Sequence, residues 1–251
     1  QSNNHTYDLG ADGLSATKEF WANMPSDVVT AGIYDDETLY NIPTNTINGI
    51  KFAYLSYTQF TNGLPTPANS PYYVIYTSQT DIIEKQIKLA RETADFVIVS
   101  VHWGNEDSHN ITQGQTDLAQ QFADFGADVI IGTHPHVIQS VSNLISIDGR
   151  TVLCAYSLGN FVSAQAKPDQ MLGYILKFDA VMNNGKKSIE NILVCPTVNH
   201  FGNNHSNIQV YMLDDYTEEM ALQHGVRSEY PFFNLEYINE VFSTYIPQEF
   251  L

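Results

Sequence analysis

Val129-Ile130-Ile131-Gly132-Thr133-His134-Pro135-His136-Val137 is the stretch from which most of the fold can be inferred. A run of apolar, β-branched residues bounded by glycine is typical of a strand buried inside a sheet. A residue before proline is pushed towards extended geometry, so we expect His134 to be extended and to project its imidazole to the same side as His136. Neutral imidazole is the commonest metal-binding side chain. The turn therefore predicts a pair of metal ligands, and the alternative is two surface histidines in a turn.

The segments before this stretch predict a parallel βαβ unit. Phe96–Val101 is a continuous apolar run, and apolar spacing predicts a helix over Gln113–Phe125. A strand, a helix and a second strand in this order form a right-handed crossover with parallel strands. Ligands bind at the carboxyl ends of such strands, so His102 is expected to converge with His134 and His136. Three imidazoles at one sheet edge suit zinc, manganese or iron, whereas a polar rim without metal is the alternative.

Periodicity and turn residues predict the other elements. Asn48-Gly49 and Asn183-Asn184-Gly185 are typical of hairpin turns, and the Pro- and Asn-rich residues 58–76 predict a long ordered loop of the kind that is often functional. Further helices are expected over 13–22, 80–93 (capped by Ser78 or Thr80), 217–224 and 235–244. Further strands are expected over 28–32, 44–47, 50–57 and 151–155, and antiparallel ones over 171–181, 188–195 and 207–213. We expect one domain over 1–251, with 215–251 as a C-terminal appendage.

Charge and composition narrow the class of partner. The 251 residues include 11 Lys or Arg and 28 Asp or Glu, which gives a formal net charge of −17. This charge argues against nucleic acid as a partner and means that an anionic substrate needs local cations or a metal. The low charged fraction, 16%, is frequent in exported bacterial proteins. Cys154 and Cys195 are expected to be buried free thiols rather than a disulfide.

Two further segments carry polar residues of interest. Asn4 can supply an amide oxygen to a metal, and the adjacent His5 can act as a general acid on a leaving group. Asn160 follows the expected strand 151–155 and so belongs at the same edge of the sheet as the histidines. A second Asn-His pair, at 204–205, lies in a Gly- and Asn-rich turn and is interpreted as part of that loop.

Together these segments resemble the CapA family, proteins of poly-γ-glutamate capsule synthesis, within the calcineurin-like metallophosphoesterase superfamily. Their order and spacing agree with the family over roughly residues 1–200. The motifs that carry the resemblance are Asn3-Asn4-His5 with Asp8 and Gly10, His102-Trp103-Gly104 with Glu106, Gly126 to Val137, and Tyr156-Ser157-Leu158-Gly159-Asn160-Phe161.

The resemblance implies an α/β fold, a sandwich of two β-sheets flanked by helices, with mixed parallel and antiparallel strands. It also implies a two-metal site that holds divalent manganese, zinc or iron. In that pattern one metal takes Asn4, His102 and His134, the other takes His136, and His5 occupies the position of the general acid. The remaining residues that the resemblance places around the site are Asp8, Trp103, Glu106 and Asn160.

The sequence departs from the family pattern at its start. The family's Gly-Asp and Asn-Leu-Glu motifs lie upstream of Asn-Asn-His, where this chain begins. We therefore expect the chain to lack the N-terminal strand or strands and the carboxylates that complete the metal site. Neutral ligands alone hold divalent ions poorly, so weak or absent metal binding and little or no enzymatic activity are expected. Glu106 and Asp107 are the nearest replacements, and the alternative is that both lie in a solvated loop.

Three functions are consistent with these observations. The first is a CapA-like role in capsular poly-γ-glutamate synthesis or export, extracellular or at the cell surface, anchored to the membrane through an upstream region and associated with a membrane polymer-synthesis complex. The second is a metal-dependent hydrolase of phosphoesters with no role in the capsule. The third is a non-catalytic binding module that has lost its metal site. The substrate is accordingly an anionic polymer or a phosphoester.

Overall fold

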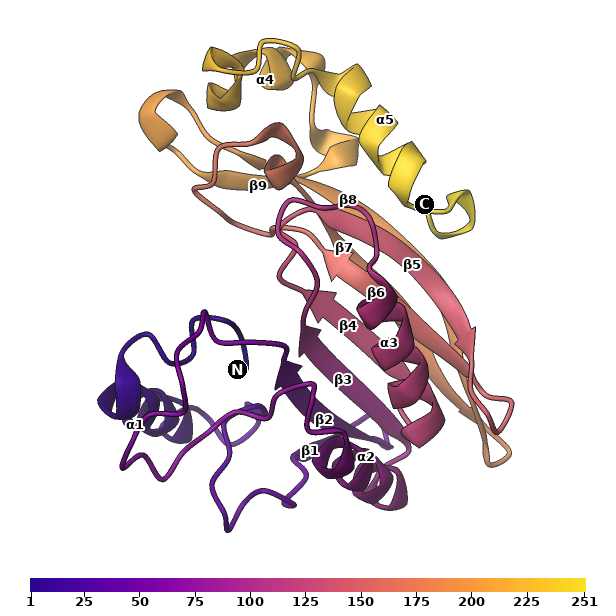
Figure 1. Cartoon of the computed structure of the whole chain (residues 1–251). Coiled ribbons are helices and arrows are strands. Elements are labelled where there is room, and N and C mark those ends of the chain that lie inside the picture. The colour runs from indigo at the N-terminus through magenta and orange to yellow at the C-terminus, as the bar shows by residue number, and fades with distance from the viewer.

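Two β-sheets form the framework of the computed structural model, which describes residues 1–251 (Figure 1). The larger sheet has six strands in the order β1-β2-β3-β4-β6-β5. Strands β2, β3, β4 and β6 are parallel to one another, and β1 and β5 run antiparallel at the two edges. The strands are β1 (Thr44–Ile47), β2 (Ile50–Thr58), β3 (Phe96–His102), β4 (Val129–Thr133), β5 (Ile138–Ile145) and β6 (Thr151–Leu158).

The central βαβ unit has the predicted arrangement. Strand β3 pairs with β4 in parallel, and α3 (Gln113–Phe125) forms the crossover. Thr112 accepts a hydrogen bond from the backbone N–H of Gln115, whose side chain returns to Thr112, so a capping box begins α3. Gly126 ends the helix with a φ of 131°, a conformation that favours glycine. The register places His102 opposite Thr133, so both strands end at the same level.

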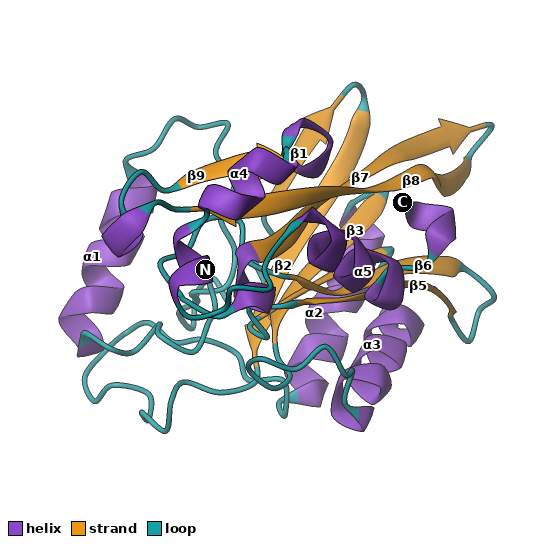
Figure 2. Ribbon diagram, turned by 90° about the horizontal axis from the view of Figure 1, so that it is seen from above, coloured by secondary structure: helices purple, strands orange, loops and turns teal.

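Alternate residues of the six-stranded sheet belong to two different cores. Ile130 packs with α3 and with α2 (Thr80–Thr93) on one face, whereas its neighbour Val129 packs on the other face with the second sheet. Figure 2 shows α2 and α3 on the side of this sheet that faces away from β7 and β8. The mixed two-sheet α/β architecture with flanking helices was therefore predicted correctly.

The second sheet is antiparallel, as expected, and has the order β7-β8-β9. Its strands are β7 (Leu172–Asn183), β8 (Lys186–His200) and β9 (Gln209–Met212). Asn184 and Gly185 both have positive φ, as a tight two-residue hairpin requires, and Asn48-Gly49 makes the same turn between β1 and β2. The C-terminal helices α4 (Glu218–Gln223) and α5 (Leu235–Tyr245) contribute Ala221, Ile238 and Phe242 to the core beneath this sheet.

Several local predictions were wrong. Residues 28–32 form no strand, because the Gly32 carbonyl accepts a hydrogen bond from the Ser2 side chain instead of from a neighbouring strand. Neither Ser78 nor Thr80 caps α2, since Thr80 is already its first helical residue and Gln79 is the N-cap. Strand β5 was missed, although its residues alternate between half-buried and exposed at its outer end. Helix α1 (Gly10–Ala22) begins three residues before the predicted start and packs Leu14 in a small separate core.

Both cysteines are free thiols. Cys154 is fully buried, as predicted, whereas Cys195 is only half-buried. Burial raises the pKa of the Cys154 thiol, so this side chain stays protonated and packs as a small apolar residue.

Gly132, the last residue before the Thr-His-Pro-His turn, is predicted to accept no larger residue. A Cβ there would lie 1.9 Å from the Tyr156 carbonyl oxygen and 2.5 Å from Trp103 Nε1. We expect Gly132→Ala to lower the free energy of unfolding by at least about 3 kcal/mol, measured by urea denaturation. The control is Gly114→Ala in α3, where the nearest atom is 3.9 Å away. That change should stabilise the protein by about 0.5–1 kcal/mol, because alanine favours helix. Equal stability of the Gly132→Ala variant and the wild type would contradict the prediction.

His224 is predicted to make the fold sensitive to acid. Its Nδ1 accepts a hydrogen bond from the Val226 N–H at 2.9 Å, and its Nε2 lies 3.0 Å from the Asn199 carbonyl oxygen. Only the neutral ring with its proton on Nε2 satisfies both contacts, and burial lowers the pKa of His224 to about 4. The unfolded chain, with a pKa of about 6.5, takes up this proton first as the pH falls. This contribution to stability is therefore complete above about pH 6.5 and is lost between about pH 6.5 and 4.

Urea unfolding at pH 7 and pH 5 measures this effect. His224 should account for about 2 kcal/mol of the stability that the wild type loses between these two pH values. His224→Phe should lower stability at pH 7 but show a pH dependence smaller by that amount. The same pH dependence in both proteins would show that His224 is not the titrating group.

Candidate metal centre

His102 is the last residue of β3 and contacts the N-terminal segment. Its Nε2 lies 2.9 Å from the Asn4 side-chain oxygen, and its Nδ1 lies 3.0 Å from the Thr133 hydroxyl on the neighbouring strand. Asn4 is itself buried and donates from its amide nitrogen to Asn62 at 3.1 Å, which directs its oxygen towards His102. The structure thus joins residues 98 positions apart in the sequence and brings together two of the expected metal ligands, Asn4 and His102.

The His134-Pro135-His136 turn follows β4 directly, but its backbone is not the predicted one. His134 has a φ of 102° and His136 a φ of 61°, so neither residue is extended. The chain reverses sharply because β4 ends at Thr133 and β5 begins at Ile138, antiparallel to β6. Outside the turn positions that asparagine and glycine favour, positive φ costs about 1–3 kcal/mol and clusters at functional sites. The surrounding fold therefore holds the two imidazoles in this arrangement at a cost in free energy.

We call the cluster around His102, His134 and His136 at this edge of the sheet the centre. His134 is the least exposed of these three histidines. Only 6% of its surface is exposed, and its Nδ1 has no hydrogen-bond partner in the protein. Its ring lies 4.7 Å from the ring of His102 and 4.7 Å, edge-on, from Phe60. Burial lowers the pKa of His134 and lowers that of His102 to about 3, so both rings are neutral at physiological pH. A neutral imidazole has the free lone pair that a metal requires.

Asn160 fixes the tautomer of His136. The amide nitrogen of Asn160 donates to Gln165 Oε1 at 2.7 Å and to the Gln170 carbonyl at 3.1 Å, so its oxygen is the atom that faces His136. That oxygen lies 3.0 Å from His136 Nδ1, which must therefore carry the proton. The lone pair of His136 is then on Nε2, free to bind a ligand. Hydrogen bonding of the second ring nitrogen in this way is the usual support for a metal-binding histidine.

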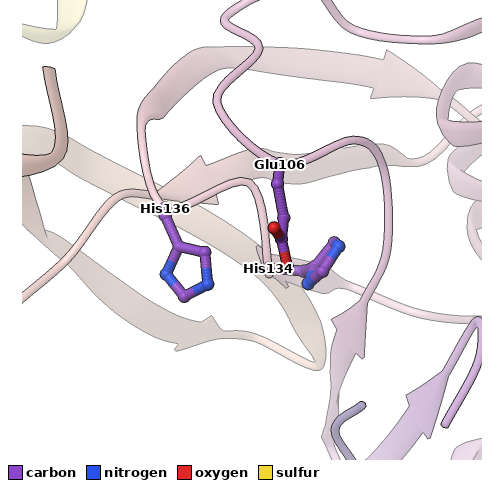
Figure 3. Close-up of side chains that lie close together, drawn as sticks. All are labelled: Glu106, His134 and His136. Carbon is purple, nitrogen blue, oxygen red and sulfur yellow. The ribbon is translucent and has the colours of Figure 1, made fainter. Parts of the chain in front are cut away.

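Glu106 joins the two histidines of the turn. One ligand atom each from Glu106, His134 and His136 lies within 4.8 Å of the others, and Figure 3 shows the carboxylate pointing towards His134. The backbone brings Glu106 there, since the N–H of Asp107 donates to the Pro135 carbonyl, inside the histidine turn, at 2.8 Å. Asp107 itself faces elsewhere and contacts Lys167 and Gln170. Of the two carboxylates considered from sequence, Glu106 therefore lies at the centre.

His5 and Asp8 form a pair at the exposed edge. His5 Nδ1 lies 2.7 Å from an Asp8 carboxylate oxygen, and both side chains face solvent. Trp103, predicted to line the site, is instead fully buried in the core, where it stacks on Phe122 and Tyr156. The cause is the alternation of the chain at the end of β3, which turns Trp103 away from the side that His102 faces.

These side chains fit a divalent cation. Nitrogen and oxygen donors from His, Asn and Glu are the ligands that zinc, manganese and iron accept. The 2.9 Å between Asn4 Oδ1 and His102 Nε2 matches the roughly 3 Å between adjacent ligands of one ion, each about 2.1 Å from it. The buried, unpaired His134 Nδ1 is a further sign of a missing partner. The donors form two groups: Asn4 with His102, and Glu106 with His134 and His136, and the rings of His102 and His134 lie 4.7 Å apart.

Two residues at the centre were not anticipated from sequence. Asn62, which orients Asn4, and Phe60, which packs on His134, both lie in the 58–76 loop. The length and composition of that loop indicated a functional segment but did not single out these positions. Thr133 was part of the opening stretch, yet only the pairing of β3 with β4 shows that its hydroxyl faces His102.

Comparison with known proteins identifies the family. The family model described as bacterial capsule synthesis protein PGA_cap matches residues 1–165. The chain belongs to this family. It is 34% identical over 165 residues to the PGA biosynthesis protein CapA of Bacillus subtilis (strain 168), covering 65% of this chain and 42% of that protein. It is also 34% identical over 169 residues to the capsule biosynthesis protein CapA of Bacillus anthracis, covering 65% and 39%.

The chain thus spans about two fifths of the length of these CapA proteins. Among solved structures, it is similar to a Staphylococcus aureus protein assigned as a 5′-nucleotidase. The TM-score is 0.51 at 17% identity, over 77% of this chain and 36% of the other. The fold is therefore an α/β fold similar to that of the Staphylococcus aureus protein. None of the helices is long and apolar enough to span a membrane.

Removal of a ligand at the centre should weaken metal binding. We expect His134→Ala to lower the affinity for Mn²⁺ or Zn²⁺ about a hundredfold, because one of a few nitrogen donors is lost. Isothermal titration calorimetry of the metal-free protein measures this. His205→Ala is the control, since that exposed ring stacks on Phe201 in a different part of the molecule. Equal affinities in all three proteins would contradict a metal centre at His134.

Proposed function

We propose that this chain acts in the synthesis or export of an anionic capsule polymer, poly-γ-glutamate, at the bacterial cell surface, through a divalent-metal centre at its His-Pro-His turn. The observation that carries the proposal is the position of the family match. Residues 1–165 contain every side chain of the centre, from Asn4 to Asn160. The CapA proteins of Bacillus subtilis and Bacillus anthracis are similar over this part, and their names assign them to PGA and capsule biosynthesis.

The residues at the centre have distinct roles in this proposal. Asn4, His102, His134, His136 and Glu106 hold divalent ions, which when bound polarise a phosphoryl or carbonyl oxygen and lower the pKa of water. Asn160 keeps the proton of His136 on Nδ1.

His5 acts at the exposed edge. It is positioned to donate a proton to a leaving group, and the Asp8 carboxylate beside Nδ1 orients its ring. Because His5 faces solvent, a large substrate can reach it without any movement of the core.

The proposal also explains how an acidic protein could bind an anionic polymer. With a net charge of −17, the protein repels a polymer of carboxylates at long range. Bound divalent cations reverse the sign of the field locally, at the edge of the sheet where Glu106 supplies a carboxylate. We therefore expect polymer binding to depend on metal, and partner proteins of a membrane polymer-synthesis complex to bind other surfaces.

Loss of the centre should abolish polymer production. In the bacterium that encodes this protein, we expect replacement of its gene by a His134→Ala/His136→Ala version to reduce surface poly-γ-glutamate as strongly as deletion does. The polymer is quantified after extraction, and immunoblotting checks that the variant accumulates normally. His205→Ala serves as the control and should leave polymer unchanged. Normal polymer levels in the deletion strain would rule out the capsule role.

The donor set at the centre favours a second candidate, a metal-dependent phosphoesterase without a role in the capsule. Its test is hydrolysis of bis-p-nitrophenyl phosphate with Mn²⁺, Zn²⁺ or Fe²⁺. Turnover that is lost in His134→Ala, together with normal polymer in the deletion strain, supports this candidate. Polymer that depends on the gene but not on the metal-binding side chains indicates a non-catalytic binding role.

A further inference from the structure

Residues 167–171, which follow the segment matched by the family model, contact residues beside the centre. Lys167 precedes a short 3-10 helix, Pro168–Met171, and we call residues 167–171 the clamp turn. This turn follows the matched segment, which ends at residue 165. Its side chains and backbone contact Asp107 on one side of the centre and Asn160 on the other.

On the first side, the clamp turn holds the residue next to Glu106. Lys167 Nζ donates to one Asp107 carboxylate oxygen at 2.6 Å, and Gln170 Nε2 donates to the other at 2.5 Å. Asp107 has a φ of 58° and its N–H bonds to the Pro135 carbonyl. Because both the backbone and the carboxylate of Asp107 are held by hydrogen bonds, the backbone of the adjacent Glu106 is restrained. Glu106 can then move mainly by rotation of its side chain. A ligand held in this way loses less conformational entropy when it binds an ion.

On the second side, the clamp turn holds the partner of His136. The Gln170 carbonyl accepts a hydrogen bond from the Asn160 amide nitrogen at 3.1 Å, and the Asn160 oxygen faces His136 Nδ1. Gln170 therefore contacts Asp107 through its side chain and Asn160 through its backbone. Gln170 therefore links the residue next to Glu106 with the residue that orients His136, and in this way restrains the distance between Glu106 and His136.

Helix α5 fixes the clamp turn from behind. The Tyr237 hydroxyl donates to the Asp169 carboxylate. The second Asp169 oxygen lies 3.4 Å from Nε2 of His109, whose ring is stacked on Tyr245 of α5 at 3.9 Å and nearly parallel. His109 belongs to the same loop as Glu106 and Asp107, so α5 contacts both the clamp turn and the loop that carries Glu106. Simple core packing does not require three polar contacts from one turn to converge on Asp107 and Asn160, the neighbours of two metal-binding side chains.

We propose that the clamp turn is a positioning element that holds Glu106 and His136 at the spacing required by one divalent ion, and that α5 tunes metal affinity through Tyr237 and Asp169. The proposal rests on the metal centre of the proposed function. It makes the clamp turn and α5, both outside the matched segment, part of the apparatus that binds metal. Lys167, Asp169, Gln170 and Tyr237 are positioning residues, since they act through Asp107, Asn160 and the loop that carries Glu106.

Two variants test the clamp without touching a ligand. Tyr237→Phe removes only the hydroxyl that bonds Asp169, and Gln170→Met removes the amide that bonds Asp107 while keeping a long side chain. We expect each to weaken Mn²⁺ binding about tenfold by calorimetry, at the low end of the effect of residues that support metal ligands. The electron paramagnetic resonance spectrum of bound Mn²⁺ should also change, because the coordination of the ion becomes less uniform.

The matched control is Tyr216→Phe. Tyr216 is a buried tyrosine whose hydroxyl lies 2.7 Å from His200 Nδ1 and makes no hydrogen bond to the clamp turn. It should leave Mn²⁺ affinity unchanged even where it lowers the melting temperature of the metal-free protein.

The outcomes separate the clamp from the metal centre itself. Wild-type affinity and spectrum in both Tyr237→Phe and Gln170→Met, with a lower melting temperature, would show that these contacts are only structural and would overturn the clamp. Absence of Mn²⁺ binding by the wild type would overturn the clamp and the proposed metal centre together. Weaker binding in these variants but not in Tyr216→Phe supports the clamp.

Discussion

The parallel pairing of β3 with β4 is the constraint on which the candidate site depends. Their register places His102 opposite Thr133, so the residues that follow both strands emerge at one edge of the sheet. The pairing in turn requires close packing on the far side of β4, where the Tyr156 carbonyl and the Trp103 indole occupy the space of a side chain at Gly132. A single missing Cβ therefore allows β3, β4 and β6 to approach one another, and the histidines at their ends follow from that approach.

The opening stretch predicted the buried strand and the convergence of the histidines because both depend on regular, local rules. Apolar runs predict strands, and parallel strands share an edge. The backbone of His134 did not follow the rule for residues before proline, since the sharp reversal into β5 imposes a positive φ. Trp103 shows a related limit. Its neighbours in sequence are His102 and Gly104, but its environment is set by Phe122 and Tyr156, which are distant in the chain.

The supporting contacts could not be read from the sequence at all. Asn62, Gln165 and Gln170 have no distinctive spacing. Asn62 and Gln170 act through long-range contacts with Asn4 and Asp107, and Gln165 through a contact with Asn160 in an irregular loop. Hydrogen bonds of this kind depend on the side-chain direction of residues in irregular segments, for which no periodicity exists. Glu106 was recognised as a candidate, but its membership of the cluster rests on the backbone bond from Asp107 to Pro135. Ligand types are thus more predictable than the residues that orient them.

The contact between Asn4 and His102 also closes a loop of the chain. The two residues are 98 positions apart, and the protein has no disulfide to restrict that stretch. Closure of a long loop lowers the entropy of a flexible chain by an amount that grows with loop length. A bond at this position, whether a hydrogen bond or an ion shared by both residues, thus acts as a reversible cross-link between the N-terminal segment and the sheet. Binding of an ion by Asn4 and His102 would therefore favour the ordered state of the N-terminal segment, and order in that segment would in turn favour binding of the ion.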